Sequence, residues 1–443
     1  MKKLISLLLI ILFVFSFVLV NLPLYGQDMS EKNIRIGLYF DKTARQNYFL
    51  SSSSGFNLFQ KENNDFKIIA EIDYVNIEAA LQNGKLVFLN SKQLIPNLNF
   101  ALSFEKPVYI ASKSEFISIE GKRYRGYIGF LPDLSQKGMT VINELKLEEY
   151  LYGVVPLEMP PSWPMEALKA QAVAARTYAV YNLNKWGKYG FDLTSTTSDQ
   201  AYGGVDCENP RTTQAVDLTQ GELLYYQDRP ILAYFHSNSG GFIENFSEWY
   251  FQDLPYLKAK EDTFSAEAPN LTWEKNLSFE ELESILKSAG FDLGNVIDFI
   301  VVEKSSTGRV KKVLIKGTKG EKTFTANEIR NLFSLKSTLF EVDAKKPVYV
   351  VSKSGNFSLM SFSGPIFIES RFGKNHLTSF SNIFMIGRDA IKKVDISSGI
   401  KIIGRGWGHG IGMSQWGAKI MAEKGYNYKD ILSFYYSNVD IRR

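Results

Sequence analysis

One carboxylate in this chain has a setting that suits acid catalysis. Glu158 lies between the apolar segment Val154–Pro156 and the pair Pro160-Pro161. Such neighbours limit the hydration of a carboxyl group and raise its pKa, as a general acid requires. The same residue could instead be an acid that favours the positive N-terminal end of the following helix. The local sequence leaves both roles open.

Two basic residues follow Glu158 at a helical spacing. Lys169 and Arg176 belong to the segment MEALKAQAVAARTYAVY and share one stripe of a helix. They could extend along the helix surface with their charged ends in water. Alternatively, they point into a cleft, where they bind substrate oxygens or balance the charge of Glu158.

Two polar segments are further candidates for ligand binding. The loop TSDQAYGG ends in a glycine pair, and AYFHSNSGG places polar residues directly after a strand. Polar groups at such positions often line a site. A Ser–His pair could suggest nucleophilic catalysis, but adjacent strand residues face opposite ways and no nucleophile elbow is present. The candidates for substrate binding are Ser198, Gln200, Tyr202, His236, Ser237 and Ser239.

A glycine-rich loop near the C-terminus adds two more candidates, His409 and Gln415. The segment GRGWGHGIGMSQWGA lacks the Gly-Lys-Ser/Thr ending of a phosphate loop and the spacing of a dinucleotide site. Dense glycine lets a backbone approach a ligand closely. Tryptophan and glutamine beside it suit a sugar. The alternative is a tight core loop in which Trp407 and Trp416 are buried.

The elements that must position these residues predict an α+β fold. We expect a mixed, β-rich core in which a long Ala-rich helix supports a cleft, together with a small N-terminal β-rich unit at 33–118. The helix should begin near Ser162, with Ser162 as its cap, and end at Gly187 and Gly190. Residues 119–443 form the main domain, and 344–400 are a β-rich insertion.

The N-terminus and the composition restrict location and partners. A positive tip and an apolar run at 4–20 predict a signal peptide or membrane anchor over 1–26, which places the body outside the cytoplasm. A net charge of +4 is too small to indicate nucleic acid. Cys207 is the one cysteine, so no internal disulfide forms. No sequence-local metal site stands out, and we expect no required metal or cofactor.

Several of these segments together resemble one known family. They are EMPPSWPMEALKAQAVAARTYAVYN, TSDQAYGG, AYFHSNSGG, GRV with STLF, and GRGWGHGIGMSQWGAKIMAEKGYNYKDILSFYYSNV. In this order they resemble the sporulation stage II protein D family, also called the amidase-enhancer family. The resemblance covers residues 119–443, and its first and last motifs are highly specific.

The resemblance implies a secreted or membrane-anchored lytic transglycosylase of the cell wall. Such enzymes cleave peptidoglycan strands from which an amidase has removed the stem peptides, and they leave anhydro-muramic ends. The catalytic acid of the family corresponds to Glu158, and the supporting basic residues correspond to Lys169 and Arg176. We therefore expect Glu158 to be the lone acid/base of a glycan cleft that also contains the loop of His409 and the strand end of His236.

Two other functions stay open at this point. The chain could be a binding module that stimulates a cell-wall amidase without cutting glycan. It could also be a hydrolase, which usually needs a second carboxylate; Asp199, Glu244 and Glu248 are the weaker candidates. Some family members are described with a metal held by His and Cys, for which Cys207 and His236 are the corresponding residues to test.

Overall fold

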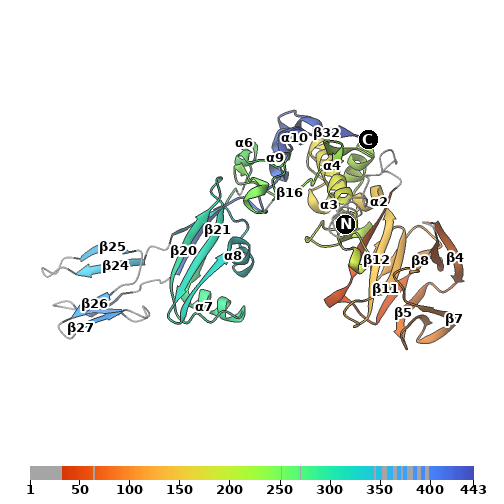
Figure 1. Cartoon of the computed structure of the whole chain (residues 1–443), viewed down its shortest axis with the longest axis horizontal. Helices are drawn as coiled ribbons and strands as arrows, with labels where there is room; N and C mark the ends of the chain where they lie inside the picture. The colour runs from red at the N-terminus through yellow and green to blue at the C-terminus, as the bar shows by residue number, and fades with distance from the viewer. Residues whose placement is uncertain are drawn as a thin grey trace, which may run out of the picture. The chain divides into compact units, whose positions relative to one another are not determined.

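The computed structural model describes residues 32–443, except 63–64, 251, 270, 344–345, 352–356, 363–366, 371–372, 377–382, 387–390 and 395–398. The chain forms two compact units (Figure 1). Unit 1 comprises Met1–Leu232 with Val439–Arg443, and unit 2 comprises Ala233–Asn438. The predicted signal peptide or anchor at 1–26 lies outside the described residues.

Two sheets dominate unit 1; the smaller is antiparallel, and the larger is antiparallel except for the parallel pairing of β13 with β1. Their order is β13-β1-β12-β11-β8-β3-β4 in the larger sheet and β10-β9-β2-β5-β6-β7 in the smaller one. The larger sheet contains β1 (Asn33–Tyr39), β3 (Phe56–Glu62), β4 (Asp65–Ile72), β8 (Val108–Ser112), β11 (Tyr127–Pro132), β12 (Met139–Lys146) and β13 (Leu193–Thr194). The smaller sheet contains β2 (Asn47–Ser51), β5 (Asn76–Gln82), β6 (Lys85–Asn90), β7 (Gln93–Ala101), β9 (Ile117–Ile119) and β10 (Lys122–Tyr124).

The strands on the two sides of residue 118 belong to one sheet, which differs from the predicted boundary. β1 pairs with β12, and β8 pairs with β11, with Ile110 opposite Ile128 (Figure 1). Seven of the eight residues of β12 are buried. A strand that is buried on both faces lies inside a sheet, with a neighbouring strand on each edge. For β12 the two neighbours are β11 and β1, and β1 belongs to residues 33–118. The β-rich character predicted for this segment is therefore correct, while its strands share a sheet with later residues.

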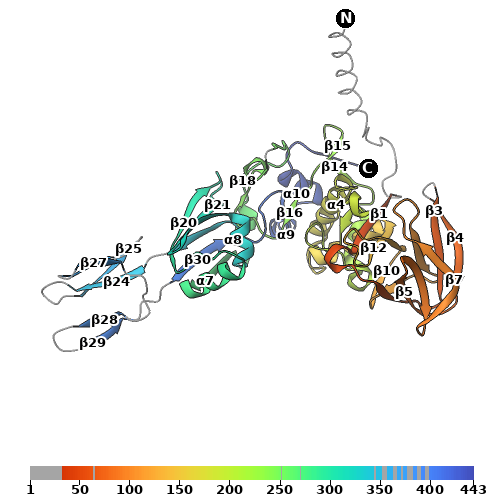
Figure 2. The same ribbon diagram turned by 60° about the horizontal axis from the view of Figure 1, so that its bottom comes forward.

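The described part of unit 1 also contains four α-helices. They are α2 (Leu147–Tyr152), α3 (Val155–Glu158), α4 (Met165–Tyr181) and α5 (Pro210–Leu218). The small sheet β15-β14-β32 completes the unit; it contains β14 (Leu223–Tyr226), β15 (Arg229–Pro230) and β32 (Asp440–Arg442), which brings the C-terminal residues back to unit 1 (Figure 2).

The long Ala-rich helix is shorter than predicted at both ends. It begins at Met165 with Pro164 at the N-cap, so Ser162 does not cap it. It ends at Tyr181, before the predicted glycines, because the side-chain amide of Asn182 donates to the carbonyl of Tyr178 at 2.8 Å. The residues of the predicted stripe that lie in the helix, Leu168, Ala172, Ala175 and Ala179, are all 0% exposed, and so are residues elsewhere around the helix, such as Ala167, Ala170 and Ala174.

Unit 2 contains two three-stranded sheets with two helices packed on them (Figure 2). One sheet contains β20 (Val296–Lys304), β21 (Val310–Gly317) and β22 (Gly320–Thr325), and the other contains β19 (Thr272–Ser278), β23 (Phe340–Asp343) and β30 (Gly399–Arg405). The helices are α7 (Phe279–Ser288) and α8 (Ala326–Leu332). Ser278 and Thr325 cap them through capping boxes with Glu281 and Glu328, as their sequences predict.

Short elements complete unit 2. They are β16 (Phe235–His236), β17 (Phe242–Ile243), β18 (Lys260–Glu261), β31 (Met413–Ser414), α6 (Thr263–Ala266), α9 (Gln415–Glu423) and α10 (Tyr428–Tyr435). The pairing of β23 with β30 brings Asp343 opposite Lys401, so the chain leaves and re-enters one sheet at adjacent strands. The intervening hairpins are β24 (Lys346–Val351) with β25 (Phe357–Phe362), β26 (Phe367–Ser370) with β27 (Gly373–His376), and β28 (Ile383–Ile386) with β29 (Ile391–Val394). The predicted insertion at 344–400 covers the residues between these two strands and stays a prediction.

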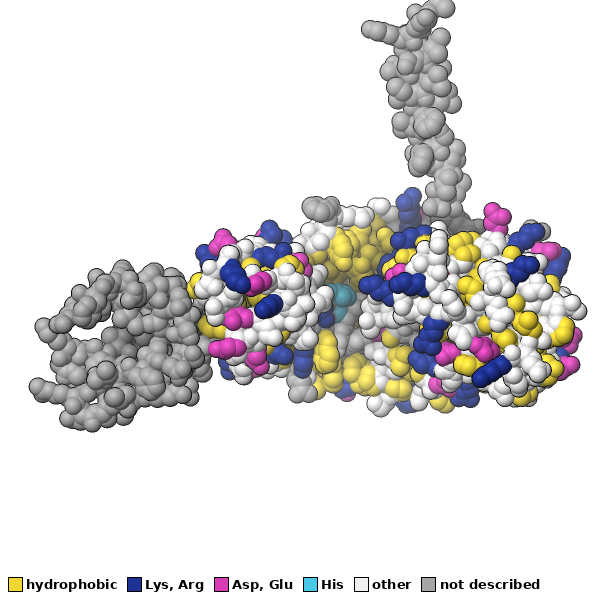
Figure 3. All heavy atoms as spheres, turned by 90° about the horizontal axis from the view of Figure 1, so that it is seen from below, with side chains coloured by type: hydrophobic (Ala, Val, Ile, Leu, Met, Phe, Trp, Pro, Cys, Tyr) yellow, Lys and Arg dark blue, Asp and Glu magenta, His cyan; other side chains and the backbone are white. Residues whose placement is uncertain are grey.

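The surface has a mixed charge pattern. Figure 3 shows basic and acidic side chains interspersed over the described residues of one face. This pattern agrees with the small net charge of the chain, +4. Among the described residues, no helix combines the length and the apolar character needed to cross a membrane.

Candidate functional site

Glu158 is the last residue of α3 and is half-buried. Its carboxylate accepts a hydrogen bond from the backbone N–H of Ala201 at 3.2 Å. Ala201 belongs to the TSDQAYGG loop, so the structure brings together two motifs that are more than 40 residues apart in sequence, |i−j| = 43. This N–H donor fixes the position of one carboxylate oxygen of Glu158.

The proline-rich corner after Glu158 is held by an arginine. The guanidinium of Arg211 donates to the carbonyl of Pro161 at 2.8 Å and to that of Trp163 at 2.9 Å. Asn209 caps α5 and accepts the N–H of Arg211, which places this arginine at the first turn. Trp163 is 8% exposed and anchors the corner in the core. These contacts give Glu158 a rigid loop, as a catalytic acid needs.

Asp199 organises the loop that contacts Glu158. Its carboxylate accepts hydrogen bonds from the indole N–H of Trp186 at 2.9 Å, from both the N–H and the hydroxyl of Thr194, and from Lys185 and Tyr178. Burial tends to raise the pKa of Asp199, but the hydrogen bonds from Lys185 and Thr194 outweigh it and lower the pKa below its usual value. The side chain is 0% exposed. Asp199 is therefore a structural carboxylate of this loop.

Three predicted substrate residues of this loop have different environments. Gln200 is 0% exposed; its oxygen accepts the Tyr150 hydroxyl at 3.2 Å and its amide donates to the Ala175 carbonyl at 3.3 Å. Tyr202 is 7% exposed and donates to the side chain of Asn143 at 2.7 Å. The polar groups of Gln200 and Tyr202 therefore bond to other buried residues, and both side chains hold the loop against the core. Ser198 is exposed.

The two basic residues of α4 do not share an environment. Arg176 is 0% exposed and forms a bidentate ion pair with Glu148, with N–O distances of 2.8 and 2.7 Å. It also donates to the carbonyls of Glu222 and Val216, both at 3.2 Å. It therefore joins α2, α4 and α5 from inside, and its side chain is not exposed to solvent. Lys169 is partly exposed and pairs with Glu166 at 2.7 Å.

In unit 2, His236 and His409 form a pair of neighbouring rings, 5.3 Å apart between centroids. His236 is 4% exposed, and its Nδ1 contacts the carbonyl of Ile411 at 3.0 Å. His409 contacts the Phe235 carbonyl through Nε2 at 3.0 Å and accepts the N–H of Ile411 through Nδ1. A carbonyl only accepts, so these contacts define the proton position on each ring. His236 therefore presents Nε2 as an acceptor, and this buried atom has no partner among the described residues.

Both histidines are neutral at neutral pH. Burial, followed by the neighbouring charges of His409 and Arg309, lowers the pKa of His236 well below its usual value. Burial and the charge of Arg309 lower the pKa of His409 to about 4. Neither ring can therefore serve as a cation for an anionic substrate.

The remaining candidates of unit 2 lie around a buried network. Ser239 is 0% exposed and donates to the carboxylate of Asp262 at 2.8 Å, and Ser265 donates to Ser414 at 2.6 Å. Gln415 is 7% exposed at the start of α9, whereas Ser237 is partly exposed. Ser239 and Gln415 are thus mainly structural, and Ser237 stays accessible for a ligand.

Sequence reasoning missed Arg309, a fully buried cation of unit 2. It is 0% exposed and donates to the carbonyl of Ser239 at 2.6 Å. Its guanidinium lies against Gly410, where a Cβ would be 2.2 Å from Nη2. Burial lowers the pKa of Arg309 to about 10. The GRV motif was the only available signal for this residue, and it does not reveal burial.

The two other carboxylates considered for hydrolysis also have structural partners. Glu244 is 0% exposed and accepts the hydroxyls of Ser305 at 2.5 Å and Thr307 at 2.6 Å. Glu248 pairs with Lys311 at 3.2 Å. Both belong to unit 2, whereas Glu158 belongs to unit 1.

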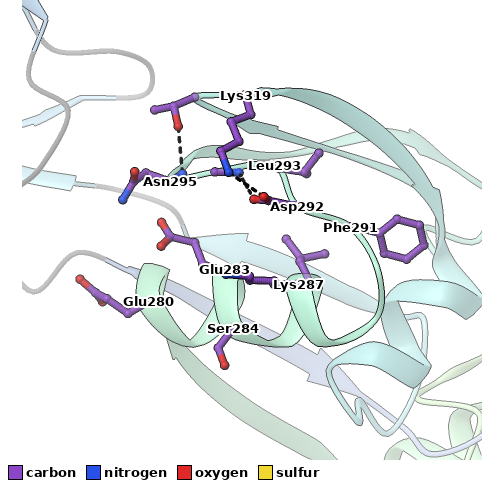
Figure 4. A pocket seen from close by; sticks show the side chains of 12 residues that line it. Glu280, Glu283, Ser284, Lys287, Phe291, Asp292, Leu293, Asn295 and Lys319 are labelled. Atoms are coloured by element: carbon purple, nitrogen blue, oxygen red, sulfur yellow. Dashed lines mark hydrogen bonds and ion pairs between the residues drawn. The ribbon is translucent and has the colours of Figure 1, made fainter.

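A polar pocket lies at α7, away from the predicted site residues, none of which lines it (Figure 4). Its lining includes Glu280, Lys287 and the ion pair of Asp292 with Lys319 at 2.6 Å. The carboxylate of Glu283 accepts the N–H of Val296 at 2.7 Å. The charged groups of this pocket are thus largely paired with one another or with the backbone.

The residues considered for a metal belong to different units. Cys207 belongs to unit 1 and His236 to unit 2. The thiol of Cys207 donates to the carbonyls of Gly153 and Gly204, both at 3.2 Å, and burial raises its pKa. In the part of the chain that the structure describes, no three His, Cys, Asp or Glu side chains gather at one point. We therefore derive no step through a metal.

Comparisons with known proteins identify relatives of this chain. Residues 135–226 match a family described as Stage II sporulation protein, and residues 256–364 match a domain of unknown function. An uncharacterised protein of Brachyspira hyodysenteriae is 35% identical over 326 residues, which are 73% of this chain and 73% of that protein. Stage II sporulation protein D of Bacillus amyloliquefaciens is 29% identical over 317 residues, 68% of this chain and 75% of that protein.

A further relative is longer than this chain. The amidase enhancer of Bacillus subtilis is 34% identical over 339 residues, which are 73% of this chain. The matched region spans only 45% of the enhancer. The first family match contains Glu158, Lys169, Arg176 and the whole TSDQAYGG loop.

Proposed function

Since the chain belongs to the stage II sporulation protein D family, we propose that it is a lytic transglycosylase of peptidoglycan. Its substrates are glycan strands that lack stem peptides, and its products carry anhydro-muramic ends. Glu158 is the single acid/base of the reaction. The reaction is a non-hydrolytic cleavage, in which no water enters the product.

The observation that carries this proposal is the setting of Glu158. A half-buried carboxylate on a pinned corner accepts one N–H from Ala201. The candidate second carboxylate of the same unit, Asp199, is 0% exposed and is saturated by hydrogen bonds. A glycoside hydrolase usually needs two available carboxylates. One carboxylate is sufficient when a hydroxyl of the sugar itself is the nucleophile.

Glu158 acts first as the acid and then as the base of the reaction. Protonated Glu158 gives its proton to the glycosidic oxygen as the bond from this oxygen to the anomeric carbon breaks. The C6 hydroxyl of the muramic residue attacks the anomeric carbon and forms the new C–O bond. The carboxylate of Glu158 takes the proton of that hydroxyl, which restores the acid.

Some of the other residues would contact the substrate, and others would support Glu158 from the interior. We assign Lys169, which is partly exposed, to substrate oxygens, together with Ser198 of the loop. Arg176 acts from the interior, because its ion pair with Glu148 joins the helices behind Glu158. Unit 2 has accessible candidates of its own for binding glycan, Ser237 and the loop of His409.

The names of the relatives bear on location and partners. Proteins named for sporulation and for enhancing an amidase support a role at the cell envelope, outside the cytoplasm. A cell-wall amidase that produces the peptide-free strands is a fitting partner. Residues 1–26 would deliver the protein to this compartment as a signal peptide or an anchor.

The name of one relative, the amidase enhancer of Bacillus subtilis, favours a second proposal. On this proposal, the chain binds glycan and stimulates an amidase without cutting the strand. The long helix and the buried loop network would then serve only to present a binding surface.

Mass spectrometry of digested peptide-free strands separates the functions. A lytic transglycosylase yields anhydro-muramic ends, a hydrolase yields reducing ends that are heavier by one water, and an enhancer yields no new ends. Glu158→Gln should abolish the anhydro products. If that variant cleaves as well as the parent protein, the assignment of Glu158 is wrong.

A further inference from the structure

Unit 2 presents one tryptophan to solvent from a fixed backbone. Trp407 is 54% exposed. Its N–H donates to the carbonyl of Asn238 at 2.8 Å, and its carbonyl accepts the N–H of Asn238 at 2.9 Å. Asn238 is itself 5% exposed, and its side chain accepts the N–H of Gly240 at 2.8 Å. The sequence had left burial of Trp407 open as an alternative, and the structure excludes it for this residue.

A lysine accompanies the exposed ring. The Nζ of Lys336 lies 5.0 Å from the centroid of the Trp407 ring. The carbonyl of Lys336 accepts the N–H of Gly408 at 2.9 Å, so the backbones that carry the cation and the ring are joined directly. Lys336 is exposed, and it takes part in none of the ion pairs found among the described residues. A flat apolar surface thus lies next to a cation without a carboxylate partner in the described structure.

We propose that Trp407 and Lys336 form a subsite for a muramic acid residue whose lactyl group ends in a free carboxylate. This inference rests on the proposed function and adds the group that unit 2 recognises. The apolar face of the sugar ring stacks on the indole, as aromatic side chains offer large, flat contact areas. The ammonium of Lys336 binds the carboxylate. An exposed cation–π contact is weak, so Lys336 can turn from the ring to the ligand.

The chemistry of peptide removal explains why such a subsite would matter. In an intact strand, the lactyl carbonyl forms an amide bond with the stem peptide and carries no charge. An amidase adds water across this bond, which breaks the C–N bond, releases the peptide amine and leaves a carboxylate on the sugar. Lys336 therefore distinguishes stripped from intact strands at the one group that the amidase changes.

Equilibrium binding to the full chain tests the subsite. Both parent and variants carry Glu158→Gln, so that the ligand stays intact. The probes are peptide-free glycan, the same glycan before amidase treatment, and a chitin oligosaccharide, which lacks the lactyl group. Trp407→Ala should weaken binding of all three about two- to tenfold, since it removes the stacking surface. Lys336→Gln should weaken binding of the peptide-free glycan alone, about two- to fivefold for an exposed ion pair.

Two matched variants control for general surface effects. Tyr426→Ala removes another exposed aromatic residue of unit 2, 42% exposed, and Lys322→Gln removes another lysine next to a ring. Both should bind like the parent. Unchanged glycan binding by Trp407→Ala overturns the subsite, and it does so even if amidase binding is lost. Equal weakening of all three glycans by Lys336→Gln overturns carboxylate recognition. Failure of the proposed cleavage would be seen separately, as absent anhydro ends in protein that retains Glu158.

Discussion

The backbone N–H of Ala201 donates to the carboxylate of Glu158 at 3.2 Å. The two residues before Ala201 hold the loop that supplies this N–H. Asp199 precedes it with bonds to Trp186 and Thr194, and Gln200 bridges Tyr150 to the carbonyl of Ala175. The orientation of the proposed acid therefore depends on residues whose side chains are buried, Asp199 and Gln200.

Replacement of Glu158 tests the proposed acid directly. Glu158→Gln keeps the shape and loses the proton that the leaving oxygen needs. We expect cleavage of peptide-free glycan to fall about a hundred- to ten-thousandfold, the usual contribution of a general acid. Initial rates of anhydro-end formation measure this change. Glu166→Gln, on the first turn of α4, is the control and should retain most activity.

Replacement of Arg176 tests its structural role. Arg176→Met leaves Glu148 as a buried carboxylate without its bidentate partner. Removal of one member of a buried ion pair lowers the free energy of unfolding by about 3–5 kcal/mol. Urea denaturation measures this quantity. Lys169→Met breaks a partly exposed pair on the same helix, so a change of at most about 1 kcal/mol is expected. Equal effects of the two variants would argue against the interior role of Arg176.

The histidine pair predicts a dependence of stability on pH. The pKa of His409 is about 4 in the folded protein, against 6.5 for an ordinary histidine. Between these values the unfolded chain binds a proton that the folded chain does not. The free energy of unfolding should therefore fall as the pH is lowered from about 6.5 toward about 4.

A variant can separate His409 from other titrating groups. His409→Gln retains a donor for the Phe235 carbonyl and an acceptor for the Ile411 N–H without titrating. It should flatten the slope of unfolding free energy against pH in this window. A slope that is unchanged in His409→Gln would show that other groups cause it.

Gly412 and Gly425 both have positive φ angles, but we expect replacement by alanine to destabilise the protein by different amounts. Gly412 has φ +70°, and a Cβ there would lie 2.0 Å from the backbone oxygen of Tyr234. Gly425 has φ +91°, and a Cβ there meets nothing within 4 Å. Alanine is strained by the left-handed backbone at both positions. Gly412→Ala should therefore cost about 1–3 kcal/mol more than Gly425→Ala, since only the former overlaps fixed backbone. Thermal and urea unfolding of the two variants test this difference.

The local elements of unit 2 could be predicted from sequence because their signals are short-range. Ser278 with Glu281, and Thr325 with Glu328, mark the starts of α7 and α8 within one helical turn. The hairpin of β20 and β21 and the helices α9 and α10 follow similarly from local pattern. The predicted start of α4 was wrong, because the N-cap residue is Pro164 and not Ser162.

By itself, the sequence determined the motif of Glu158, the small-residue face of α4 and the family of the chain. Each of these is a property of neighbouring residues or of their order. Only the tertiary structure decided that Ala201 holds Glu158, that Arg176 and Gln200 are buried supports, and that Trp407 is exposed. Burial and long-range hydrogen bonds depend on which distant segments pack together. The types of residues 176 and 407 do not specify whether their side chains point inward or outward.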